Sequence, residues 1–404
     1  MSTTARMKDI DVLRGIAIIF VLIQHTAYNL IYWNQKSLFE FYDYCDGTVG
    51  VALFFVISGF LITKLYLSDF QKENKTTTIN NALLFWCRRG VRLFPAALFW
   101  LLAVIAGSLF SKSFGSVKAS LEGAFAALFQ IANFRFMSCF GHYECGLNVV
   151  HWTLSLEQQF YFIFPFLVYF TKKKLAPVLG LLLVLQLFSA SFEAPFGFRF
   201  SGFVIGILIG ILSKSSYYTV IMPRFLNKSL LTRIVLFTFL IVALTFSMGK
   251  NTELGTQNLK YNLATFISGI LVLIASYNQS FLLPQSRVKS LLLFIGERSY
   301  SYYLCHMFCF VLAKIILQPY YPQNEPNALA MFIYMGVAAL FCGVFGEFSY
   351  RILEVNFKKR AQPYINTLKM NLPSDVPQTL MQDMKKRSPT DPITRQSNTL
   401  VDTL

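Results

Sequence analysis

The chain has 404 residues, of which 55% are hydrophobic and only 14% are charged. This composition excludes an ordinary soluble globular domain and indicates a polytopic membrane protein. The formal net charge of +16 would suggest nucleic acid as the partner of a soluble chain; here most basic residues lie in short loops between apolar segments, which indicates membrane topology, and we expect no nucleic-acid partner.

The first apolar segment, residues 10–33, contains two ionisable side chains, Arg14 and His25. Its length of about 36 Å exceeds the ~30 Å hydrocarbon core, and no small-residue cleavage site follows it, so we expect a retained anchor helix. Arg14 and His25 fall within about 20° of each other on one helix face, about 16 Å apart in depth. Ionisable groups inside a membrane usually face a cavity or the bundle interior and mark a functional site. The alternatives are that the Arg14 side chain snorkels to the lipid headgroups and that His25 is a packing residue without a functional role.

The second span and the loop after it carry further candidate residues. Ser58 and Gly59 form either a kink beside a cavity or a simple packing contact. The arginines Arg88, Arg89 and Arg92 then precede the third span on the predicted cytoplasmic side. The preference of basic residues for the cytoplasmic side of membrane proteins can alone explain this cluster, but guanidinium groups also bind phosphates in bidentate fashion.

The fourth span carries Glu157 about one and a half turns from its external end. A carboxylate at this depth is costly and needs a partner, and its depth makes a contact with His25 geometrically possible. His306 in the ninth span either lines the same cavity or is a hydrogen-bonded core residue. The spacing of the histidines His25, His142, His151 and His306 is not that of a metal cluster, so no metal site is predicted.

Ten apolar spans organise the chain as an all-α membrane helix bundle. Their ranges are 10–33, 47–67, 93–111, 152–171, 175–192, 198–213, 232–249, 261–278, 293–317 and 328–350. With the N-terminus inside, about 28 of the 36 Lys and Arg residues are cytoplasmic, and both termini lie in the cytoplasm. The apolar stretch 121–136 is too short and interrupted to be a span, so we expect an outer-leaflet or re-entrant segment there.

Residues 1–360 form the predicted membrane domain, and residues 361–404 form a polar, disordered cytoplasmic tail. Near the end of the last span, Glu347, Arg351 and Glu354 are expected to counter the arginine cluster structurally.

Two smaller patterns concern packing and cross-linking. The glycines Gly202, Gly206 and Gly210 form a stripe that is typical of close helix packing. In the external loop, Cys139 and Cys145 are positioned to close a short disulfide, with Cys45 as a competing partner.

Five motifs together resemble the acyltransferase-3 family of membrane acyltransferases over about residues 9–360. In chain order they are DVLRGIAIIFVLIQH, VGVALFFVISGFLIT, RRGVRLFP, HWTLSLEQQFYFIFP and IGERSYSYYLCH. The family's Arg-x10-His motif falls on Arg14 and His25, and its Arg-x-x-Arg motif falls on Arg89 and Arg92. Its Trp-Ser-Leu-x-x-Glu-x-Gln-Phe-Tyr pattern matches at Trp152, Leu154, Glu157, Gln159, Phe160 and Tyr161. The chain departs from the family at Ala52, at Gln158 and at Glu354-Val355-Asn356.

The resemblance implies a bacterial inner-membrane O-acetyltransferase that moves acetyl from cytoplasmic acetyl-CoA to an envelope glycan such as lipopolysaccharide O-antigen. Arg14, Arg88, Arg89 and Arg92 would bind the phosphates of acetyl-CoA. His25 would act as general base or as covalent acetyl carrier, with Glu157 orienting it or the acceptor. The expected partners are membrane lipid and a carbohydrate or glycolipid acceptor. The rival interpretation is a transporter or flippase for an anionic lipid-linked substrate, without chemistry.

Overall fold

The computed structural model describes residues 6–30, 46–72, 74–188, 199–249, 257–322 and 328–372. All regular elements in these ranges are helices, so the all-α expectation is confirmed for the described part of the chain. The principal helices are α1 (Lys8–Asn29), α3 (Thr48–Phe70), α4 (Lys75–Phe110), α5 (Val117–Leu128), α6 (Ala132–Cys139), α7 (His151–Thr171), α8 (Leu175–Phe188), α9 (Ser201–Leu212), α10 (Tyr217–Val220), α11 (Leu230–Ser247), α12 (Gln257–Ser276), α13 (Arg287–Glu297), α14 (Ser299–Leu317), α15 (Ala328–Phe348) and α16 (Phe357–Asn371).

Six helices in the described ranges are long and apolar enough to cross a membrane. They are α3, α4, α11, α12, α14 and the continuous helix that joins α15 to α16 through a π-helical segment, Ser349–Asn356. The other predicted spans coincide with α1, α7, α8 and α9. The count of ten spans and the cytoplasmic placement of both termini stay predictions.

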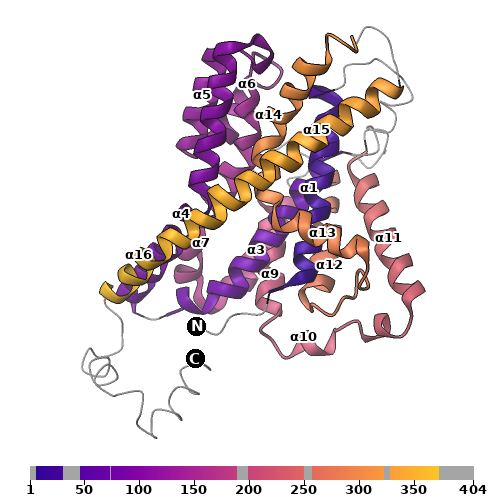
Figure 1. The fold of residues 1–404 in the computed structure, drawn as a ribbon. Helices are drawn as coiled ribbons and strands as arrows, with labels where there is room; N and C mark the ends of the chain where they lie inside the picture. Colours follow the sequence, from indigo (N-terminus) through magenta and orange to yellow (C-terminus); the bar gives the residue numbers. More distant parts are fainter. Residues whose placement is uncertain are drawn as a thin grey trace, which may run out of the picture.

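Three predicted boundaries differ from the structure. Helix α4 begins at Lys75, well before the predicted start at 93. The Asn74 side chain caps this start by accepting a hydrogen bond from the Thr76 amide at 2.9 Å. The predicted span 293–317 is divided at Arg298 into α13 and α14. The last helix continues to Asn371, beyond the predicted boundary at 361, because α16 packs on α4 and buries Ile365. Figure 1 shows this last helix running diagonally across the bundle. Residues 373–404 of the predicted tail lie outside the described residues.

The stretch that was expected to be re-entrant forms a helical hairpin of α5 and α6 at one end of the bundle (Figure 1). These helices have 12 and 8 residues, too few to cross a bilayer separately. The Gln159 side chain of α7 donates to the carbonyl of Gln130 at 2.7 Å, which fixes the hairpin tip beside α7. The Cys139–Cys145 disulfide closes the loop that follows. The competing partner, Cys45, lies outside the described residues.

Close packing of α3 on α9 explains the glycines of both helices. A Cβ on Gly206 would lie 2.2 Å from the carbonyl oxygen of Val56, and one on Gly59 would lie 2.3 Å from that of Phe203. The packing interpretation is therefore confirmed for Gly59 and for the glycine stripe, and α3 is a single helix through Ser58 and Gly59.

A buried ion pair holds α1 to α13. The Lys289 ammonium lies 2.7 Å from the Asp9 carboxylate and also donates to the Ser280 hydroxyl at 2.8 Å. The Ser280 amide donates to the other Asp9 oxygen at 2.7 Å. The side chains of Lys289 and Asp9 are 1% and 3% exposed, so removal of either partner leaves an uncompensated buried charge.

We expect Lys289→Met to destabilise the protein by about 3–5 kcal/mol, because the Asp9 carboxylate loses its cation in a buried position. Thermal unfolding of the detergent-purified variant measures the effect. Lys228→Met, at an exposed position, is the matched control and should melt as the wild type does. Equal melting temperatures for the two variants would contradict this role of the pair.

Candidate active site

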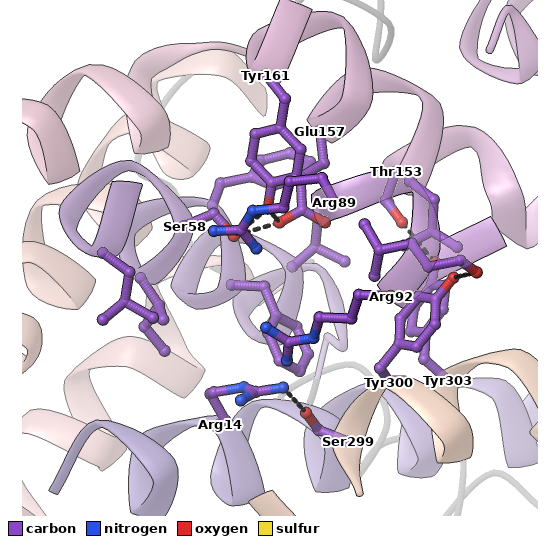
Figure 2. A pocket seen from close by; sticks show the side chains of 17 residues that line it. Arg14, Ser58, Arg89, Arg92, Thr153, Glu157, Tyr161, Ser299, Tyr300 and Tyr303 are labelled. Atoms are coloured by element: carbon purple, nitrogen blue, oxygen red, sulfur yellow. Dashed lines mark hydrogen bonds between the residues drawn. The ribbon is translucent and has the colours of Figure 1, made fainter. Parts of the chain in front are cut away.

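A cavity between five helices gathers four of the charged residues that the sequence singled out, Arg14, Arg89, Arg92 and Glu157 (Figure 2). It contains about 810 Å³ of empty space, counted to its open mouth. The polar residues in its wall are Arg14 from α1, Ser58 from α3, Arg89 and Arg92 from α4, Thr153, Glu157 and Tyr161 from α7, and Ser299, Tyr300 and Tyr303 from α14. Sequence segments that lie far apart thus meet in one polar chamber within the bundle.

The three cavity arginines are held in different ways. Arg14 donates to the Ser299 hydroxyl at 2.9 Å, and the guanidinium of Arg89 lies over the Tyr161 ring at 4.8 Å. Arg92 reaches into the cavity between the Glu157 group and the Arg14–Ser299 pair (Figure 2). Its guanidinium forms no hydrogen bond or ion pair with any residue in the described ranges. Arg92 therefore has its hydrogen-bond donors available for a ligand.

Glu157 is the single carboxylate in the wall of this cavity. It accepts hydrogen bonds from the hydroxyls of Ser58 and Tyr161. The contact between Glu157 and His25 that the sequence left possible is not formed, because Glu157 faces the arginines whereas His25 packs elsewhere. Three guanidinium groups facing one carboxylate make the cavity suited to an anion with several negative charges.

Arg88, the fourth predicted phosphate ligand, does not line the cavity. Consecutive residues on a helix point about 100° apart, and the rotation of α4 that turns Arg89 and Arg92 into the cavity turns Arg88 away from it. The structure brings together Arg14, Arg89 and Arg92, and the binding role of all four arginines stays a prediction.

His25 pairs with His306 rather than with a carboxylate. The two ring centroids are 4.9 Å apart in an edge-to-face arrangement. His25 Nδ1 lies 2.8 Å from the carbonyl oxygen of Val21, and His306 Nδ1 lies 2.7 Å from that of Tyr303. A carbonyl only accepts, so these partners assign the hydrogen to Nδ1 and leave the basic lone pair on Nε2 in both rings. His306 is fully buried, and its Nε2 has no partner in the described structure.

Tyr303 separates the histidine pair from the arginine cavity. Its ring lies 5.6 Å from that of His306, and its hydroxyl contacts Thr153 Oγ1 at 2.6 Å and the Val150 carbonyl oxygen at 2.6 Å. Tyr303 and Thr153 line the cavity, whereas His25 and His306 do not. The histidines thus lie behind the wall that these two residues form.

The two acidic residues near the end of the long last helix differ in the arginines whose charge they offset. Glu347 pairs with Arg298 and Arg351 instead of with the cavity arginines. Glu354 is buried, accepts a hydrogen bond from the Ser301 hydroxyl and interacts electrostatically with the cavity arginines Arg92 and Arg14, as expected. A counter-charge role is therefore clear for Glu347, but its partners differ from the predicted cluster.

Two features escaped the sequence analysis. The polar wall residues Ser299, Tyr300 and Tyr303 belong to the motif IGERSYSYYLCH, whose polar positions on an apolar helix were the available signal. The thiols of Cys305, Cys309 and Cys342 lie within 4.8 Å of one another at the contact of α14 with α15. Such thiols suit soft metal ions in principle, but they are buried outside the cavity wall and we assign them no part in its chemistry.

Comparisons with known proteins agree with the motif pattern. A family model described as an acyltransferase domain matches residues 7–347. O-acetyltransferase OatA of Staphylococcus aureus, from strains NCTC 8325 / PS 47 and MRSA252, is 26% identical over 381 residues, covering 88% of this chain and 57% of the relative. SAS0844 of S. aureus strain MSSA476 is 28% identical over 396 residues, covering 92% of this chain and 60% of that protein. The chain thus spans about three fifths of the length of these relatives. No solved structure gives a significant match.

Proposed function

The chain belongs to the acyltransferase family whose model matches residues 7–347, and on that premise we propose that it is an integral-membrane O-acetyltransferase of the bacterial inner membrane. The proposed donor is cytoplasmic acetyl-CoA. The proposed acceptor is a hydroxyl of an envelope glycan such as lipopolysaccharide O-antigen. The family match and the names of the relatives support acyltransferase activity, and the long apolar helices of the structure support a membrane protein; donor, acceptor and orientation are our proposal.

The observation that carries the donor assignment is the unpaired guanidinium of Arg92 in a cavity that Arg14 and Arg89 also line. Acetyl-CoA carries several phosphate charges at one end and its thioester at the other. The phosphates would bind at the three arginines, which read phosphate oxygens in bidentate fashion. The pantetheine arm would then extend along α1 toward His25, which lies about 16 Å from Arg14 in depth.

His25 would act on the acceptor as a general base. Its Nε2 takes the proton of the acceptor hydroxyl while that oxygen bonds to the acetyl carbonyl carbon. The carbon–sulfur bond then breaks, and the proton on His25 passes to the leaving CoA sulfur. A two-step route in which His25 carries the acetyl group covalently fits the same geometry. Glu157 would act in the donor cavity, where it holds Tyr161 and Ser58 and offsets part of the arginine charge.

The rival function is a transporter or flippase for an anionic lipid-linked substrate. The arginine cavity would serve such a carrier equally well, since it too must bind an anion inside the bundle. The two functions differ in one requirement, because a pure carrier does not consume a thioester.

The deciding experiment follows acetyl transfer from radiolabelled acetyl-CoA in membranes that contain the protein and in matched membranes that lack it. We expect label in the envelope glycan only when the protein is present, and its release as acetate by mild base, as an O-ester requires. Glycan that moves across the membrane without gaining label would establish the carrier and reject the transferase. Label that appears equally without the protein would also reject it.

A further inference from the structure

A second cavity lies beside the arginine cavity, against another face of α7. At about 100° per residue, Thr153, Glu157 and Tyr161 share the α7 face that lines the arginine cavity. His151, Ser155 and Gln158 lie about 125° further round the helix and line the second cavity, which contains about 550 Å³ of empty space counted to its open mouth. Its remaining walls come from α4, from the tip of the α5–α6 hairpin and from Tyr300.

The two cavities differ in charge. Among the described residues, the lining of the second cavity contains no Lys, Arg, Asp or Glu, whereas three arginines line the first. Its polar side chains are an imidazole, two carboxamides and two hydroxyls, from His151, Gln130, Gln158, Ser155 and Tyr300. An ion placed there would lose hydration without gaining a counter-charge. The lining is therefore suited to a neutral ligand with hydroxyl groups.

His151 supplies a buried hydrogen-bond acceptor that nothing in the described structure uses. It is 5% exposed, and its Nδ1 lies 3.2 Å from the carbonyl oxygen of Asn148, so Nδ1 donates and Nε2 holds the lone pair. Nε2 is buried without a partner. An unsatisfied buried acceptor is unfavourable by about 1–3 kcal/mol, and a ligand hydroxyl would remove that penalty.

Gln158 adds a second unused polar group to the same face of α7. Its carboxamide forms no hydrogen bond with any residue in the described ranges, although Gln159 beside it is fully engaged with the hairpin. A carboxamide both donates and accepts, as recognition of a hydroxyl requires. Phe94, Leu98 and Leu101 provide an apolar wall opposite, against which the carbon–hydrogen face of a sugar ring can pack.

The second cavity adjoins the arginine cavity. Leu93, Leu154 and Tyr300 line both cavities, so the two spaces meet at these side chains. His151 is also within electrostatic reach of His306, whose ring packs on His25. A ligand in the second cavity would therefore lie next to the donor cavity, with His151 in its wall near the His25–His306 pair.

We propose that the second cavity is the acceptor subsite and that it binds an uncharged, hydroxylated sugar residue through His151 Nε2 and the Gln158 carboxamide. This inference rests on the proposed acetyl transfer and adds the acceptor class to it. One face of α7 serves the anionic donor and another serves a neutral acceptor. Phosphate or carboxylate groups of a larger acceptor must remain outside this cavity.

The test separates acceptor saturation from donor saturation. The purified full chain in liposomes receives radiolabelled acetyl-CoA and increasing amounts of envelope glycan stripped of its esters by base. His151→Phe and Gln158→Met keep side-chain bulk and each remove one recognition group. We expect each variant to raise the glycan concentration for half-maximal transfer by about 3- to 10-fold, the size of one net hydrogen bond, with an unchanged half-saturating acetyl-CoA concentration. Phe170→Leu, on the same helix and 77% exposed, is the control.

Each outcome decides between the proposals. An unchanged glycan half-saturation in both variants, or an equal shift in the half-saturation of donor and glycan, would overturn the acceptor subsite while wild-type transfer still stands. Loss of glycan saturation in the Phe170→Leu control as well would show a general packing defect and would also overturn it. Absence of transfer by the wild type would instead overturn the proposed function, and the acceptor subsite with it.

Discussion

Replacement of Arg92 by glutamine is expected to raise the acetyl-CoA concentration for half-maximal transfer by about 10- to 100-fold. A hydrogen bond to a charged group contributes about 1.5–3 kcal/mol, and each 1.4 kcal/mol is a factor of ten in affinity. Arg92 forms no hydrogen bond or ion pair with the described residues, so its loss removes ligand contacts, and the buried Glu354 carboxylate that it also attracts keeps its hydrogen bond from Ser301 and its attraction to Arg14. Steady-state transfer at fixed glycan and varied acetyl-CoA measures the shift.

Arg88→Gln is the matched control for Arg92→Gln. Both changes remove one arginine charge from the same stretch of α4, but Arg88 does not line the cavity. If attraction of acetyl-CoA depended only on the general positive charge of this region, both variants would weaken donor binding equally. A shift confined to Arg92→Gln would identify contact inside the cavity as the cause, and equal shifts would contradict the assigned phosphate site.

The sequence predicted the locally encoded parts of this site. Arg14 and His25 share one helix face by their spacing alone, and the glycine stripe of α9 indicates close packing without knowledge of its partner. Both inferences depend on periodicity, which a sequence contains. The grouping of Arg14 with Arg89 and Arg92 in one site came from the family resemblance, and the structure brings these three side chains to one cavity.

Which side chains of different helices contact one another could not be predicted from the sequence in the same way. Glu157 and His25 have similar depths, so depth alone permits their contact, but it does not determine the rotation of α7 about its axis. In the structure that rotation turns Glu157 toward Ser58 and places His151 and Gln158 on another face of the helix. The pairing of His25 with His306 likewise depends on the packing of α1 against α14. Side-chain packing among many helices sets these contacts, and no single segment encodes them.

Replacement of His25 by alanine is expected to lower the rate of acetyl transfer by about 10²- to 10⁴-fold, the range that a general base contributes. The half-saturating acetyl-CoA concentration should change little, because His25 lies outside the cavity that the arginines line. Initial rates of label transfer in membranes with equal amounts of protein measure the effect. His142→Ala changes an exposed histidine in the loop that the Cys139–Cys145 disulfide closes and should retain the wild-type rate.

The kinetic pattern of His25→Ala also distinguishes a role of His25 in the reaction from a role in packing of the helix bundle. His25 packs on His306, so loss of its ring could act by loosening the bundle instead of by removing a base. A loosened bundle would disturb the arginine cavity and raise the half-saturating donor concentration together with the loss of rate. A fall in maximal rate with unchanged donor saturation and unchanged thermal stability requires that His25 acts after acetyl-CoA has bound. A wild-type rate in His25→Ala would exclude both the general-base and the covalent-carrier role.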